Sequence, residues 1–291
     1  MFATPPTRMM HVLGTAVEGA DEMGSSTARS GRARGGRISI RVLTGAAAVA
    51  VMVTTGSAGA TPRPAGTFEG TSCTETENVF LRPPSALAPY LPEGFTPREV
   101  WPGLSELMIL ITRCEGAVVN GKSVGPTIFS EVGIYIEDPE RLNELGAAAA
   151  SAHQYYQVWH LTDAPALRKV MAKVGVDGGL VPDATLETPS DAEVETGVPW
   201  KRVPYSFTNT RIVGTAYYFP RASNFWHQGK KGLAVTVYPM PTGERYSSGP
   251  AFLETPADSA LAEMSGSPTG IPDGSTVFTY DGLRATTILL K

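Results

Sequence analysis

The sequence has little positive charge. Among its 291 residues, 24 Lys and Arg stand against 28 Asp and Glu, which gives a formal net charge of −4 and a pI near 5.7. Binding to a phosphate backbone needs a diffuse positive field, so nucleic acid is not expected as a partner. Hydrophobic residues make up 42% and charged residues 18% of the chain. This ordinary globular composition excludes collagen-like, coiled-coil and fully disordered proteins.

Several motifs of common enzymes are missing. No Gly-x-Ser-x-Gly elbow is predicted at a strand-to-helix turn, because the match to this pattern at residues 121–125 lies in a predicted hairpin. No glycine-rich phosphate loop precedes a predicted helix either, and both observations argue against common hydrolases and nucleotide enzymes. Histidines are scarce, and His153 and His160 have no carboxylate at metal-ligand spacing. The sequence therefore predicts neither a metal site nor a bound cofactor.

Long hydrophobic runs are also missing. The most apolar run, Val42–Val53, has about twelve residues, short of the ~20 that a membrane-spanning helix needs. It follows the basic stretch 29–41 and precedes Ala58-Gly59-Ala60, a small-x-small pattern that signal peptidase accepts. Residues 1–60 are therefore predicted to be a leader and a Sec-type secretory signal peptide, cleaved near Ala60. An uncleaved membrane anchor is the alternative.

Cleavage there would leave an acidic, secreted chain without stable membrane insertion. The basic stretch lies far from Met1, and a start at Met23 would give a leader of more usual length. The mature chain would hold 18 Lys and Arg against 25 Asp and Glu, a net charge of −7. Its residues 61–72 are rich in Pro, Gly and Thr and are predicted to be a flexible tether, followed by a single domain over 73–291.

The only two cysteines, Cys73 and Cys114, lie in the predicted mature chain. An even pair in an oxidising compartment indicates a disulfide. Closing a loop of about 42 residues would stabilise the fold by roughly 4 kcal/mol in the chain-entropy model. A metal site or a catalytic thiol has less support, because neither cysteine lies in a Cys-x-x-Cys motif or near a histidine.

The remaining chain alternates between strand and turn patterns. A hairpin is predicted around Asn120-Gly121, between the strands 105–115 and 128–137. Helices are predicted over Pro165–Val174, with Asp163 as N-cap and Gly175 as its end, and over the alanine-rich segment 140–152. Further strands are predicted over 203–208, 211–219 and 232–238, and a terminal hairpin joins 276–280 to 283–290 through Asp281-Gly282.

These elements predict a single α+β domain that is rich in antiparallel strands. Its sheet is expected to curve into a barrel-like cone around a cavity, with the two helices at its flanks. Such barrels commonly hold a small ligand in their interior.

The strand 128–137 carries a candidate functional carboxylate. Strand alternation places Glu131 on one face with Phe129 and Tyr135, and Val132 and Ile134 on the other. Glu131 is either a solvated carboxylate on the outer face or a carboxylate that lines the cavity, with a pKa raised by burial that suits it for proton transfer. Besides Phe129 and Tyr135, Arg113 and Trp226 are predicted to line the cavity.

A lysine provides the second candidate. In Gly197-Val198-Pro199-Trp200-Lys201-Arg202, the neighbouring Arg202 would favour the free amine of Lys201, which can attack a carbonyl group. The alternative is a surface basic pair at the entrance of a strand.

Two segments resemble the acetoacetate decarboxylase superfamily. The chain has Leu91-Pro92-Glu93-Gly94, then an apolar strand, and then a strand that begins with Gly125-Pro126 and carries Glu131. The likeness covers roughly residues 80–220 and implies a β-rich barrel or cone. In that family a lysine in a Gly-x-Pro-Lys-Lys run forms a Schiff base with a β-keto acid, and strand carboxylates assist.

By this resemblance Glu131 matches a strand carboxylate, and Lys201 matches the lysine with one additional residue, Trp200, before it. A slip of one residue in a strand turns a side chain to the opposite face. We therefore expect a secreted cavity protein that binds a small carbonyl- or carboxylate-bearing metabolite without decarboxylase chemistry. The alternative is a lyase that acts on a keto acid through a Lys201 Schiff base, with Glu131 in proton transfer.

Overall fold

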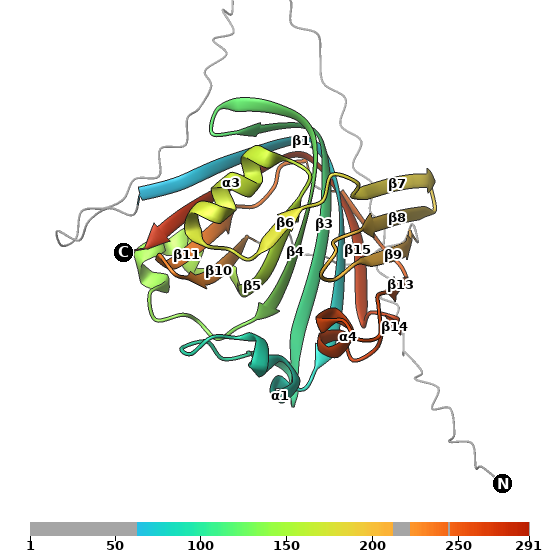
Figure 1. Cartoon of the computed structure of the whole chain (residues 1–291), viewed down its shortest axis with the longest axis horizontal. Coiled ribbons are helices and arrows are strands. Elements are labelled where there is room, and N and C mark those ends of the chain that lie inside the picture. Colours follow the sequence, from blue (N-terminus) through green and yellow to red (C-terminus); the bar gives the residue numbers. More distant parts are fainter. Residues whose placement is uncertain (1–62, 212–221, 244, 291) are drawn as a thin grey trace, which may run out of the picture. The chain divides into compact units, whose positions relative to one another are not determined.

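The computed structural model describes residues 63–211, 222–243 and 245–290 of the chain (Figure 1). The predicted leader and signal peptide over 1–60 lie outside these residues, as does almost all of the strand predicted over 211–219. No helix within the described ranges is long and apolar enough to cross a membrane.

Seven strands form a closed barrel, which confirms the predicted β-rich α+β fold. Their order around the ring is β1-β15-β11-β10-β5-β4-β3, and pairing between β1 and β3 closes it. Neighbours run antiparallel except β5 and β10, which are parallel. The strands are β1 (Arg63–Arg82), β3 (Leu104–Val119), β4 (Lys122–Tyr135), β5 (His153–Thr162), β10 (Ser223–Gly229), β11 (Gly232–Tyr238) and β15 (Gly274–Leu290).

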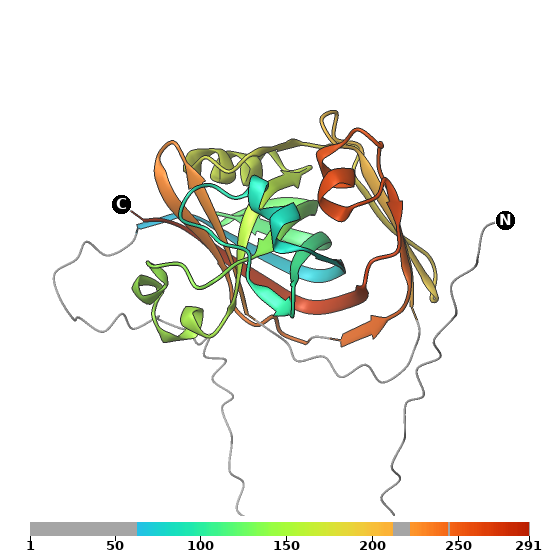
Figure 2. The same cartoon turned by 90° about the horizontal axis from the view of Figure 1, so that it is seen from below.

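Short strands extend the barrel sheet, and a second sheet lies alongside it. β2 (Glu99–Trp101) pairs with β3, β6 (Gly178–Leu180) with β5, and β12 (Arg245–Ser248) with β15. The second sheet has the order β14-β13-β9-β8-β7, from β7 (Thr185–Ser190), β8 (Glu193–Val198), β9 (Tyr205–Thr210), β13 (Ala251–Glu254) and β14 (Thr269–Gly270). Its buried side chains, such as Val194 and Phe207, share one core with Ile109 of β3, so the two sheets pack together (Figure 2).

The β3–β4 hairpin forms where Asn120-Gly121 predicts it. Asn120 and Gly121 have φ angles of 52° and 75°, the left-handed conformations that a tight two-residue turn requires. Val119 pairs with Lys122 across the turn. Turn chemistry and strand pairing therefore agree at this point of the chain.

The predicted helix over Pro165–Val174 is confirmed as α3. It buries Leu167, Val170, Met171 and Val174 against side chains of β1, β4, β11 and β15, and it ends at Gly175, whose φ is 88°. The predicted N-cap is wrong: Ala164 occupies that position, and the Asp163 carboxylate instead accepts a hydrogen bond from the backbone N of Ile128 in β4, at 2.9 Å. Asp163 thus ties the start of the helix to the barrel.

The lengths of β1 and β15 correct two predictions, one of a tether and one of a hairpin. Residues 63–72, expected to belong to a flexible tether, lie in β1, and Asp281-Gly282 lies within a continuous β15 rather than in a hairpin turn. The two strands pair from Arg63 opposite Leu289 to Val79 opposite Gly274. Long-range pairing satisfies the backbone hydrogen bonds along both segments, and this outweighs local turn propensity.

The helix predicted over 140–152 is also corrected. The structure has a 3-10 turn, η2 (Leu142–Leu145), and one turn of helix, α2 (Ala147–Ala150), on either side of Gly146, whose φ of 83° is not helical. Glycine adopts this conformation readily and so interrupts the helix. The other helical segments are α1 (Pro84–Leu87), η1 (Ala88–Tyr90) and α4 (Ala260–Ser265).

Candidate functional site

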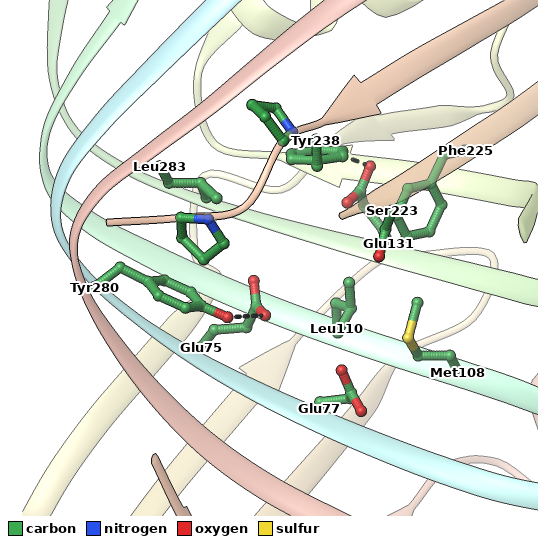
Figure 3. Close-up of a pocket in the computed structure, with 12 residues that line it drawn as sticks. Glu75, Glu77, Met108, Leu110, Glu131, Ser223, Phe225, Tyr238, Tyr280 and Leu283 are labelled. Atoms are coloured by element: carbon green, nitrogen blue, oxygen red, sulfur yellow. Dashed lines mark hydrogen bonds between the residues drawn. The ribbon is translucent and has the colours of Figure 1, made fainter. Parts of the chain in front are cut away.

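A pocket inside the barrel is the candidate functional site (Figure 3). Its volume is about 50 Å³, enough for a few water molecules or a small functional group. Six of the seven barrel strands contribute side chains, together with two prolines that follow β11. The lining residues are Glu75, Glu77, Met108, Leu110, Glu131, Ser223, Phe225, Tyr238, Pro239, Pro241, Tyr280 and Leu283.

Strand register brings the acidic side chains of the pocket together. Glu77 of β1 pairs with Leu110 of β3, and Leu110 pairs with Glu131 of β4. Side chains of directly paired residues project from the same face of a sheet, and residues two apart on one strand do so as well. Glu75, Glu77, Leu110 and Glu131 therefore all face the barrel interior.

Glu131 is the most completely buried carboxylate of the pocket, with 1% of its surface exposed. Its Oε1 accepts a hydrogen bond from Tyr238 Oη at 3.1 Å and another from Gln157 Nε2 at 2.5 Å. Burial raises the pKa of Glu131 to about 8; the two hydrogen bonds oppose this rise and the charge of Glu75 adds to it. Of the two interpretations of Glu131, the structure supports the buried, cavity-lining carboxylate.

Glu75 is the second buried carboxylate. Its Oε2 accepts a hydrogen bond from Thr112 Oγ1 at 2.6 Å, and its Oε1 accepts one from Tyr280 Oη at 2.9 Å. The pKa of Tyr238 lies well above its ordinary value because of burial and the neighbouring Glu131. The pocket thus pairs each of its two buried carboxylates with a tyrosine hydroxyl.

Lys201 lies outside this pocket. It is exposed in the turn between β8 and β9, whereas the preceding Trp200 is buried, with 7% of its surface exposed. The Trp200 ring packs against Trp159 and under the guanidinium of Arg202. The structure therefore does not bring Lys201 and Glu131 together, and none of the described residues that line the pocket is a lysine or an arginine.

Two of the predicted cavity residues are buried in other clusters. Phe129 packs edge-to-face on Phe68 and stacks on His160, close to α3. Trp226 is fully buried and donates a hydrogen bond from Nε1 to Gln154 Oε1 at 2.7 Å. Both side chains support the barrel wall, and neither lines the pocket.

The other two predicted cavity residues also lie outside the pocket. Tyr135 is half-buried near the end of β4, with the Arg98 guanidinium 5.4 Å from its ring centre. Arg113 is half-buried, forms an ion pair with Glu115 at 3.2 Å, and donates a hydrogen bond to the carbonyl of Leu186 in the second sheet. Glu131 is therefore the one predicted site residue that lines the pocket.

The predicted disulfide is present between Cys73 and Cys114. The two residues are direct partners in the β1–β3 register, and both are buried. The bridge joins the two strands that close the barrel, so it anchors the same wall that carries Glu75 and Glu77.

Sequence reasoning missed Glu75, Glu77 and Tyr238. A weak signal was available for the two glutamates, because Cys73, Glu75 and Glu77 alternate along an extended segment and so share a face with the cysteine. Tyr238 ends a predicted strand, but nothing local to its sequence shows that it reaches Glu131, which lies more than a hundred residues earlier. Within the described residues, no group of three or more His, Cys, Asp and Glu side chains could hold a metal ion.

Comparison with solved structures identifies the class of fold. An acetoacetate decarboxylase-like enzyme from Sphingomonas wittichii RW1 matches with a TM-score of 0.52 at 14% identity, over 78% of this chain and 94% of its own. An acetoacetate decarboxylase from Legionella pneumophila matches with a TM-score of 0.53 at 11% identity, over 82% of this chain and 93% of its own. The fold of this chain is thus similar to that of acetoacetate decarboxylase-like structures.

The resemblance is confined to structure. No protein-family profile and no curated protein matches the sequence. At such low identity the similarity shows a shared fold, and function has to be argued from the residues of the site.

Proposed function

We propose that this chain is a secreted cavity protein that binds a small organic metabolite in the barrel pocket without decarboxylase chemistry. The observation that carries the proposal is the make-up of the pocket. Its described lining includes three glutamates and two tyrosines but no lysine, whereas Lys201 is exposed in a turn of the second sheet. A Schiff base needs an amine at the reacting carbonyl, so the pocket supports binding better than amine catalysis.

The chemistry of the pocket limits the ligand. Phe225 and Met108 supply buried apolar surface, while Glu131 and Tyr238 supply polar groups that could orient a bound molecule. A carboxylate-bearing ligand would lie beside the buried, negatively charged Glu75, and like charges in a low-dielectric interior repel. A carbonyl-bearing ligand is therefore the better candidate of the two.

The alternative function is a lyase that acts on a keto acid through a Lys201 Schiff base. The similarity of the fold to acetoacetate decarboxylase-like structures favours keeping this candidate. It would require Lys201 to reach a carbonyl held near Glu131, which the described arrangement does not provide.

Borohydride trapping separates the two functions. The mature protein is incubated with a panel of β-keto acids and sodium borohydride, and adducts are located by peptide mass spectrometry while carbon dioxide release is followed. We expect no carbon dioxide release and no adduct specific to Lys201. An adduct that disappears in Lys201→Ala but persists in Lys122→Ala, an exposed lysine of the β3–β4 hairpin, would establish the lyase instead.

Secretion and ligand binding have a direct test of their own. Native mass spectrometry of the protein recovered from the culture medium of its own cells should show a chain that begins near residue 61 and carries a small molecule released by denaturation. Retention of the full-length chain in the cell membrane would contradict cleavage. A chain in the medium with no bound mass, and with no response to the carbonyl probe described below, would contradict the binding function.

A further inference from the structure

The two oxygens of the Glu131 carboxyl group have different surroundings. Oε1 accepts hydrogen bonds from both Tyr238 Oη and Gln157 Nε2. Oε2 receives no hydrogen bond from any described residue, although the side chain is 99% buried. Figure 3 shows this carboxyl group at the edge of the pocket, with Tyr238 to one side and Leu110 and Glu75 across the space from it.

This asymmetry determines where a proton on Glu131 would lie. Oε1 is already the acceptor of two donors, so a proton carried by the carboxyl group belongs on Oε2. There it forms an O–H donor on the oxygen that has no hydrogen-bond partner among the described residues. A buried donor without an acceptor costs free energy, and a ligand oxygen in the pocket would satisfy it.

We propose that Glu131 acts as a neutral carboxylic acid that donates a hydrogen bond from Oε2 to the carbonyl oxygen of an uncharged ligand, so that the pocket selects ketones, aldehydes or amides. The inference rests on the proposed binding function and names its ligand class. Hydrogen bonds from a carboxylic acid to a carbonyl are strong in a dry interior, and an apolar site can keep a carboxyl group neutral at pH 7 for this purpose.

The protonation state that this role needs agrees with the electrostatics. Burial and the nearby Glu75 raise the pKa of Glu131 to about 8, so the group holds its proton at neutral pH. His160, its partner across the β4–β5 pair, has a pKa lowered by burial to about 3 and stays neutral over the same range. The titratable groups that face Glu131 or share its pocket are Glu75 and Glu77 of β1, His160 of β5, Tyr238 of β11 and Tyr280 of β15.

Other ligand classes fit these observations less well. The described residues offer no group of side chains that could hold a metal ion. An anion would be placed beside the charge of Glu75, and a cation offers no acceptor for the proton that burial keeps on Glu131. A neutral carbonyl group is the ligand class that can accept a hydrogen bond from the protonated Oε2 of Glu131.

A carbonyl probe tests the proposal. N,N-dimethylformamide labelled with ¹³C at the carbonyl suits this purpose, since it has no N–H donor and forms no Schiff base. We expect a downfield shift of its carbonyl resonance on binding at pH 6. Binding should be about tenfold weaker at pH 9, because the protonated fraction of a group with a pKa near 8 falls from about 0.99 to about 0.09.

Variants at Glu131 sharpen the test. Glu131→Gln keeps a donor that does not titrate, so its affinity for the probe should be equal at pH 6 and pH 9. Glu131→Leu lacks the donor and should lose binding at both pH values. Glu254→Gln, at an exposed position of β13, should follow the wild type, and circular dichroism shows whether each variant is folded.

The outcomes distinguish this inference from the proposed function. Equal probe affinity of the wild type at pH 6 and pH 9 would overturn the inference without needing any variant. Stronger binding of acetate or of methylammonium than of dimethylformamide would also overturn it while leaving a small-molecule pocket in place. If none of the three probes binds and native mass spectrometry shows no ligand, both the inference and the proposed function are wrong.

Discussion

Substituting Glu131 by glutamine should make the protein more stable, increasingly so as pH rises. In the folded state Glu131 has a pKa of about 8, against an ordinary value of 4.5. The folded protein therefore binds this proton more tightly than the unfolded chain. Below pH 4.5 both states are protonated and the group has no effect; stability falls as pH rises from 4.5 to 8, and the full cost is present above pH 8.

The size of the effect follows from the two pKa values. Relative to a group that does not titrate, Glu131 should cost about 1 kcal/mol of stability at pH 5, about 3 kcal/mol at pH 7 and about 5 kcal/mol at pH 9. Since the side chain is only 1% exposed, solvent screening does not reduce these values appreciably. In Glu131→Gln the amide oxygen can still accept from Tyr238 and Gln157, so the contacts of Oε1 are kept.

Urea unfolding of the wild type and of Glu131→Gln at pH 5, 7 and 9 measures this difference. All other carboxylates titrate in both proteins, so the pH dependence of the difference reports the Glu131 titration and its coupling to neighbours. Any constant effect of the amide itself shifts all three values equally. A difference that stays constant over this range, or that shrinks as pH rises, would refute the buried, neutral carboxyl group.

Three further predictions concern the scaffold, and each is measured by chemical unfolding. Replacing both Cys73 and Cys114 by alanine should lower the free energy of unfolding by about 4 kcal/mol, because the bridge closes a loop whose ends are 41 residues apart. The wild type with its disulfide reduced should lose the same amount, and a much smaller loss in both would contradict the prediction. Gly175→Ala should cost about 1–2 kcal/mol, because the residue has a φ of 88° after α3, and an unchanged stability would contradict the αL assignment. Met171→Ala should lower the free energy of unfolding by about 2–5 kcal/mol, because it leaves a cavity in the core under α3. Lys169→Ala, at an exposed position of the same helix, should stay within about 0.5 kcal/mol of the wild type.

Local signals predicted several elements correctly because the forces that form them are local. The Asn120-Gly121 turn needs two residues with positive φ, and the sequence places the two best residues for it between two strands. The helix Pro165–Val174 has apolar residues at i, i+3, i+4 and i+7 with a terminal glycine, and the structure buries those four side chains. The disulfide followed from an even number of cysteines in a predicted oxidising compartment.

Other predictions failed where distant residues decide the outcome. The segment 63–72 and the Asp281-Gly282 dipeptide have turn-like or flexible compositions, yet each lies in a long strand because the other strand is there to pair with it. Asp163 is a good N-cap residue by type, but the backbone N of Ile128 competes for its carboxylate.

In the candidate site, too, local sequence patterns predicted some features and distant contacts decided others. Strand alternation indicated that Glu131 and Val132 face opposite ways, but it does not say which face is the interior when both are buried, as they are in this barrel. The resemblance pointed to Lys201, and the additional residue Trp200 gave a local reason to expect a changed position. Only the tertiary structure shows that the side chain of Trp200 is buried and that Lys201 is exposed.

By itself, then, the sequence determined the composition class, the β-rich character, one helix, one hairpin and the pairing of the two cysteines. The composition class, the strands, the helix and the hairpin depend on residue type and on spacing within a short stretch of chain, and the pairing depends on there being only two cysteines. The tertiary structure alone decided which glutamates meet in the pocket, because Glu75, Glu131 and Tyr238 lie on strands that are far apart in the sequence and become neighbours only when the barrel closes. Burial by that closure is also what raises the pKa of Glu131 above the value of a surface carboxylate.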